Sequence, residues 1–146
     1  MILALVWDNN QQALAARPMP NNRLTRLRTA VAISLFTHAR ANDEQLEIYA
    51  MEQQGFWGDP FTEGGESLGS LLWLLHRQKL LPSVINQAQN FANDSLLWLL
   101  DEPDVSDITV TAWRVNDETI GLHLVVKVHG DVLLSEQWEY NINGGN

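Results

Sequence analysis

Apolar and polar side chains alternate along the last third of the chain, and this alternation predicts β-strands. The pattern runs through residues 108–113, 121–128 and 132–140. A three-residue loop between the last two segments would set Val126 opposite Leu134 and keep one face apolar, whereas a two-residue loop would mix the faces. The pattern therefore predicts a three-stranded antiparallel meander.

Apolar residues recur at helical spacing in two earlier segments. The first predicts a helix over residues 24–40, with Arg40 near its C-terminal end. The second predicts a helix that begins at Pro82, because proline suits the first helical position. The last turn of this second helix, residues 96–100, is apolar all round and is therefore expected to be covered on every side.

The remaining segments carry weaker patterns. Residues 1–7 predict a short apolar strand, and residues 11–23, which contain two prolines and two asparagines, are interpreted as a loop. Residues 43–53 are expected to add a helical turn or two before Gly55.

A further helix is expected to start at a serine cap, Ser67 or Ser70, and to end near His76. The predicted fold class is therefore α+β, with an N-terminal strand, three to four helices and the C-terminal three-stranded antiparallel meander. A length of 146 residues favours a single domain over residues 1–146.

Composition and charge narrow the function classes. The chain has no cysteine and no apolar run of about 18 residues, so neither disulfides nor a membrane span is expected. The net charge is −9, which argues against a nucleic-acid partner. Residues 1–40 nevertheless hold five arginines against one aspartate, an asymmetry that suggests a basic end facing an acidic neighbour.

Catalytic and metal sites find little support in the pattern. Asp59, Glu63 and Glu66 could supply the two carboxylates that a glycosidase needs, but acids in a Gly-rich loop are usually only solvated. His123 and His129 have no third ligand at matching spacing. We therefore expect no metal, no cofactor and no enzymatic activity.

Tryptophans are the best candidates for partner contacts, since the chain has six of them and Trp is enriched at binding hot spots. Trp57 lies in a loop between two glycines, so it is expected to contact a partner or to anchor its own loop. Trp73 and Trp98 lie among leucines and are expected in the core. Trp138 and Tyr140 lie in an edge strand of the predicted sheet, and Trp138 could lie on either face. One of the two edge strands, residues 108–114 or 132–141, is expected to accept a strand of a partner chain.

Three separated motifs carry a family resemblance: residues 27–37, Gly55-Phe56-Trp57-Gly58-Asp59, and residues 69–75. Together with Leu5-Val6-Trp7-Asp8, they resemble the Mu-like phage gene product 46 family over nearly the whole chain. The resemblance implies a baseplate wedge subunit of a contractile tail, related to the small wedge protein that starts the sheath. It implies a virion protein, assembled in the host cytoplasm in multiple copies, whose partners are other wedge proteins and the tail sheath or tube-proximal proteins.

The chain departs from the related wedge proteins at one motif. These proteins carry Glu-Pro-Arg between the last long helix and the sheet, whereas this chain has Glu102-Pro103-Asp104. Acidic residues thus crowd a helix C-terminus, where the helix dipole disfavours anions. Either water and nearby arginines offset this charge, or the segment is an interface for cationic partner residues. Asp59 and the motif Glu102, Pro103 and Asp104 are therefore candidate partner-binding residues.

The alternative function is a lysozyme-like, peptidoglycan-acting domain of the tail tip. Assaying the purified chain for cell-wall lysis, with Glu63 and Glu66 changed to Gln as controls, would distinguish it from the structural subunit that we favour.

Overall fold

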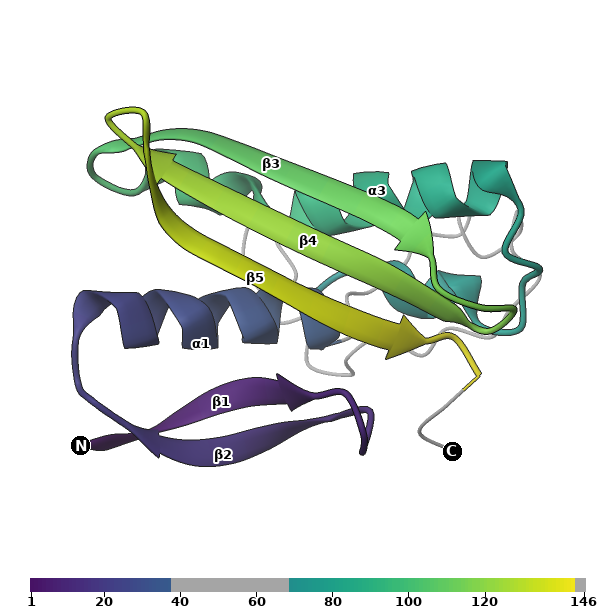
Figure 1. Cartoon of the computed structure of the whole chain (residues 1–146), viewed down its shortest axis with the longest axis horizontal. Helices are drawn as coiled ribbons and strands as arrows, with labels where there is room; N and C mark the ends of the chain where they lie inside the picture. Colours follow the sequence, from purple (N-terminus) through teal and green to yellow (C-terminus); the bar gives the residue numbers. More distant parts are fainter. Residues whose placement is uncertain (38–68, 144–146) are drawn as a thin grey trace, which may run out of the picture.

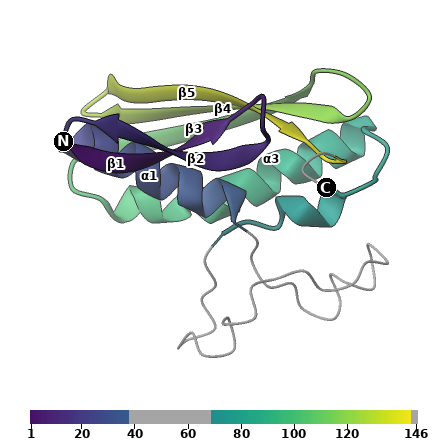
Figure 2. The same cartoon turned by 90° about the horizontal axis from the view of Figure 1, so that it is seen from below.

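A three-stranded antiparallel sheet lies over two α-helices in the computed structural model, which describes residues 1–37 and 69–143 (Figure 1). The strands follow one another in the order β3-β4-β5, so the predicted meander is confirmed. Both helices cover the same face of the sheet (Figure 2). The elements of these two layers are α1 (Arg23–Phe36), α3 (Pro82–Leu96), β3 (Val105–Arg114), β4 (Thr119–Val128) and β5 (Asp131–Asn141).

The connection between β4 and β5 differs from the predicted one. Only His129 and Gly130 form the turn, with φ angles of 52° and 85°, and Val128 pairs with Asp131. A β-bulge follows, so Val126 still pairs with Leu134 as predicted. The extra residue in the bulged strand moves the side chains back into phase, and the apolar face is kept with a shorter loop.

The predicted three to four helices are too many, since the described residues contain two α-helices and two short 3₁₀-helices, η3 (Leu72–Leu75) and η4 (Leu97–Asp101). The helix expected from Ser67 or Ser70 to His76 is reduced to η3. Ser70 donates from Oγ to the Leu35 carbonyl at 2.6 Å, which ties this segment to the end of α1. The expected helix at 43–53 lies outside the described residues.

A second sheet, formed by β1 (Ile2–Asp8) and β2 (Ala13–Met19), replaces the single N-terminal strand and the loop that the sequence predicted. Pro18 argued against a strand, because proline cannot donate to a sheet ladder. It is tolerated because it pairs with Leu3 at a position whose N–H would point away from β1. Backbone groups in an antiparallel pair point alternately towards the partner strand and away from it. The Leu5 N–H donates to Thr29 Oγ1 on α1 and so points away from β2. The Leu3–Pro18 pair lies two residues further along and therefore points its backbone groups away from the partner strand in the same manner.

The two α-helices begin where their capping residues indicate. Asn22 caps α1 by accepting a hydrogen bond from the Thr25 N–H at 2.9 Å, and Pro82 is the first residue of α3. Helix α1 ends at Phe36 rather than at Arg40, because Thr37 is already extended. No helix in the described part of the chain is long and apolar enough to cross a membrane.

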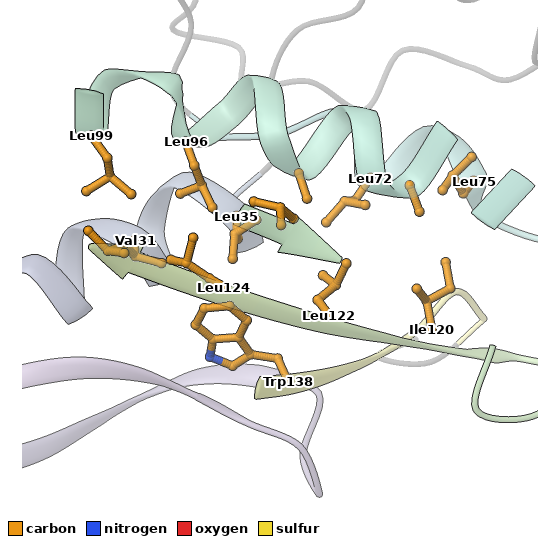
Figure 3. Packing of buried hydrophobic residues seen from close by; sticks show 14 of the residues in the cluster. Val31, Leu35, Leu72, Leu75, Leu96, Leu99, Ile120, Leu122, Leu124 and Trp138 are labelled. Atoms are coloured by element: carbon orange, nitrogen blue, oxygen red, sulfur yellow. The ribbon is translucent and has the colours of Figure 1, made fainter. Parts of the chain in front are cut away.

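The hydrophobic core lies between the sheet and the two helices (Figure 3). Leu122, Leu124 and Val126 of β4 are at most 1% exposed and face the helices. The apolar stripe of α3 is buried at Ala88, Ala92 and Leu96. The expectation that residues 96–100 are covered on every side is wrong, since two leucines of η4 are each 47% exposed. They are Leu97 and Leu100.

Candidate functional site

The predicted partner-binding residues fall in three parts of the chain. Trp57 and Asp59 lie outside the described residues. Glu102, Pro103 and Asp104 form the turn that connects η4 to β3, which we call the acidic turn. Trp138 and Tyr140 lie in β5, on the face that packs against the helices.

The acidic turn is held by its own backbone and by α1. The Pro103 carbonyl accepts a hydrogen bond from Arg23 Nη2 at 2.7 Å, and Arg23 is the first residue of α1. Asp104 has a left-handed φ of 69°, which turns the chain into β3. Its Oδ1 lies 3.4 Å from Nε2 of His129, at the turn between β4 and β5. The nearby arginine thus binds a carbonyl of the turn and not one of its carboxylates.

The carboxylates around the acidic turn have few cationic neighbours. Within the described ranges, Asp101, Glu102 and Asp107 form no ion pair with a lysine or an arginine. The exposed Leu97 and Leu100 precede them on η4. The surface therefore combines exposed apolar side chains with unpaired negative charge. Neither sequence hypothesis for this motif is decided, and its role as a partner contact stays a prediction.

Trp138 and Tyr140 belong to an aromatic cluster that joins three elements. Trp7 of β1 stacks on Phe36 of α1 with ring centroids 4.1 Å apart, and Phe36 meets the Trp138 ring edge-on at 5.8 Å. Tyr140 lies 6.0 Å from Trp7. Trp138 is 8% exposed, and its ring belongs to the cluster of Leu122 and Leu124 (Figure 3). In this conformation both rings face the interior of their own chain.

Burial of Tyr140 gives the protein an alkaline pH dependence. Loss of solvent raises the pKa of its phenol from 10 to about 12. The unfolded chain releases this proton near pH 10. The stabilisation that comes from the raised pKa of Tyr140 is therefore fully present below pH 10 and is lost as the pH rises towards 12. A pKa shift of this size corresponds to about 3 kcal/mol of the free energy of unfolding.

We expect the free energy of unfolding in urea to fall more steeply between pH 9.5 and 11.5 for the wild type than for Tyr140→Phe. The comparison cancels the titration of the lysines, which both proteins share. Equal slopes for the two proteins would show that the phenol ionises as readily in the folded state as in the unfolded one.

One edge of the three-stranded sheet is β3, and described residues leave part of it unpaired. Gln89 of α3 accepts a hydrogen bond from the Ala112 N–H at 3.0 Å, so the backbone of Ala112 points away from β4. By the alternation of an antiparallel ladder, Ile108 and Val110 point their N–H and C=O groups the same way. In the described part of the chain, no hydrogen bond reaches these groups. Unpaired edge groups of this kind can pair with a strand of another chain.

The β5 edge is partly covered, by residues that the sequence interpretation missed. Asn9 and Gln12, in the turn between β1 and β2, bind the backbone of Glu139 and Asn141. The run Asn9-Asn10-Gln11-Gln12 indicated only a turn. Nothing in it shows that the amides bind a strand about 130 residues away.

The described side chains do not form a metal centre. No group of three or more His, Cys, Asp or Glu residues among them could hold a metal ion. The candidate acids Glu63 and Glu66 lie outside the described residues, so the lysozyme-like alternative gains no geometric support from the described part.

Comparisons with known proteins give a consistent result. Residues 27–132 match the model of the family described as "Phage protein GP46". The chain is 30% identical over 143 residues to "Baseplate protein gp46" of Escherichia phage Mu, which covers 97% of both chains. It is 32% identical over 124 residues to "Mu-like prophage FluMu protein gp46" of Haemophilus influenzae, covering 85% of this chain and 84% of the relative. No solved structure matches it.

The matched residues run from α1 into β5, so they include both layers of the fold, the acidic turn and the β3 edge. The relationship supports a structural role in a phage baseplate. With a family match over most of its length and a relative aligned almost end to end, this chain belongs to the phage protein GP46 family.

Proposed function

We propose that the chain is a structural wedge subunit of a contractile-tail baseplate, and that it starts the sheath by accepting a strand at β3. The family relationship supports the baseplate role, and it favours structure over catalysis. The outward backbone groups of Ile108 and Val110, to which no described residue forms a hydrogen bond, are the single observation that carries the strand-accepting part.

The occupant of the β3 edge is an extended segment of a neighbouring sheath or tube-proximal subunit. Strand addition joins two chains through main-chain hydrogen bonds, and it needs a free edge on a sheet that is already stable. The apolar side of β3 is anchored by Ile108, Val110 and Ala112, which face the helices. The face of β3 that points away from the helices carries polar residues such as Thr109 and Thr111. A strand added at the β3 edge therefore extends the sheet without exposing the core.

The acidic turn is the proposed contact with another wedge subunit. Among the described residues, Asp101, Glu102 and Asp107, in and beside this turn, have no lysine or arginine partner, which favours a partner surface that carries such residues. Such complementarity mainly sets orientation and association rate. Leu97 and Leu100 add apolar area beside the charge. A partner helix with both basic and apolar residues fits this combination. Trp57 and Asp59 remain proposed partner contacts from the sequence.

The proposal places the chain in the tail baseplate of the virion, in multiple copies around the tail, after assembly in the host cytoplasm, and the names of its relatives support the baseplate location. The two proposed surfaces adjoin each other on the fold. The β3 edge is at one margin of the sheet, and the acidic turn is at the start of the same strand (Figure 1). A wedge partner and a sheath strand would therefore bind next to each other on one subunit.

Deleting the gene for this chain from its phage tests the proposal. We expect lysates of the deletion to contain no tails with an assembled sheath, because the first sheath ring lacks its attachment. A plasmid copy of the wild-type gene should restore sheathed tails in electron micrographs. Sheathed tails of normal length in the deletion, without the plasmid, would contradict the proposed function.

A further inference from the structure

The turn of the N-terminal hairpin reaches across to the free edge of β5 (Figure 1). The Glu139 N–H donates to Asn9 Oδ1 at 3.0 Å, and the Asn141 N–H donates to Gln12 Oε1 at 2.6 Å. The Glu139 carbonyl accepts from Gln12 Nε2 at 2.9 Å and from Trp7 Nε1 at 2.8 Å. These side chains therefore bind the same outward backbone groups that an added fourth strand would bind.

The turn presents its amides in a fixed geometry. Asp8 Oδ1 accepts hydrogen bonds from the N–H groups of Asn10 and Gln11, and the Gln12 N–H donates to the Asp8 carbonyl at 2.8 Å. Gln12 takes a left-handed φ of 53°, and its Nε2 also donates to the Asn9 carbonyl. An aspartate that binds the following N–H groups is a common way to hold a turn. The amides are thus held in place for β5.

The outer edge of the hairpin is itself partly protected. The outer strand β2 contains Pro18, which has no N–H to donate. Arg17 donates from Nη1 to the Ala16 carbonyl at 3.0 Å, which occupies an outward acceptor of the same strand. Proline and charged side chains are the devices by which natural proteins protect sheet edges from pairing.

We propose that the hairpin turn, residues 9–12, is an edge guard: its amides take the place of a fourth strand and prevent β5 from pairing with a second copy of this chain. The guard closes β5 at Glu139 and Asn141, whereas no described residue binds the outward groups of β3 at Ile108 and Val110. The sheet thus offers one edge for strand addition, and copies of the chain do not join through their β5 strands before assembly.

The double variant Asn9→Ala, Gln12→Ala tests the guard in the isolated full-length chain. It removes three of the four hydrogen bonds to β5 and leaves the Trp7 bond in place. We expect the amide protons of Glu139 and Asn141 to exchange about tenfold faster or more, since each loses its hydrogen-bond partner. The amide exchange of β4 should stay unchanged. Sedimentation should show self-association that increases with concentration.

The matched control is Asn10→Ala, Gln11→Ala. Both residues lie in the same turn, and only their backbone N–H groups form hydrogen bonds with the described residues. The control therefore removes two side-chain amides that make no such bond. We expect its exchange rates and its sedimentation to equal those of the wild type. Self-association of the control as strong as that of the double variant would overturn the proposal, because loss of surface amides would then suffice.

A third variant identifies the edge that associates. Adding Glu139→Pro to the double variant removes an outward N–H without breaking the ladder to β4, so it should restore the sedimentation of the wild type. Association that persists in this variant would show that β5 is not the edge involved. The proposal would also be contradicted if the double variant itself showed the amide exchange rates and the sedimentation of the wild type. No tail is needed for these measurements, so their outcome is independent of the baseplate role.

Discussion

Tails should fail to acquire a sheath when Ile108 is changed to proline, whereas Ile108→Ala should support assembly. Both variants lose the half-buried isoleucine side chain, and only the proline removes the outward N–H of β3 and places a ring at the edge. The two proteins therefore differ mainly in their ability to accept a strand. We expect at least a tenfold difference in the number of sheathed tails when each gene complements the deletion.

The melting temperatures of the two purified variants provide the control. They should lie close together, because a proline at an edge position leaves the inner ladder of hydrogen bonds intact. Equal numbers of sheathed tails from both variants would show that assembly does not use the β3 edge at Ile108.

Loss of the Trp138 side chain should cause the largest loss of stability that we predict. Trp138 is 8% exposed and contacts Phe36 and the leucines of β4, and truncating a buried Trp costs about 3–5 kcal/mol. For a chain of this length, that corresponds to a drop of roughly 10 °C in melting temperature. Urea unfolding of Trp138→Ala measures the free energy directly.

Trp113→Ala is the matched control, since Trp113 is 37% exposed and its ring lies over Gly121 on the opposite face of the sheet. We expect its loss of stability to be clearly smaller. If Trp138→Ala melted near the wild-type temperature but failed to enter tails, Trp138 would be a partner contact, as the sequence interpretation had it.

The sheet was predictable because its signal is local. Alternation along β4 places Leu122, Leu124 and Val126 on one face, and the structure buries all three. The loop length was not predictable, because two arrangements keep that face apolar. A three-residue loop and a two-residue turn with a bulge place Val126 opposite Leu134 equally well.

The helices and the N-terminal hairpin show where local patterns mislead. Apolar residues in a row suggested a helix after Ser70, but Leu72–Leu75 are buried on all sides and form only one 3₁₀ turn. Pro18 argued against a strand, and only the pairing with β1 shows that its missing N–H lies on the outer side. Both outcomes depend on contacts with distant segments, which override local preference.

The charge asymmetry of the sequence is used partly within the chain. Arg28 Nε of α1 lies 2.5 Å from Glu136 Oε1 of β5, an ion pair whose N–H is not aligned for a hydrogen bond. Arg23 binds the Pro103 carbonyl, and Arg17 lies 3.3 Å from Asp8. The expected acidic neighbour of these basic residues is thus in part the chain itself, whereas Glu102 of the acidic turn has no lysine or arginine partner among the described residues.

Candidate interface residues were only partly accessible from the sequence. The acidic turn stood out because a helix C-terminus followed by Glu102-Pro103-Asp104 is visible in one segment. The difference between the two sheet edges was not visible, because it depends on Asn9 and Gln12 meeting Glu139 and Asn141. No periodicity links residues so far apart.

Cryo-electron microscopy of the assembled tail tests the central claim most directly. We expect copies of this chain in the baseplate, each with a strand of a neighbouring subunit hydrogen-bonded to β3 at Ile108 and Val110. The β5 edge should still be covered by the hairpin turn. A baseplate in which β3 of every copy faces solvent, or pairs with no other chain, would contradict the account.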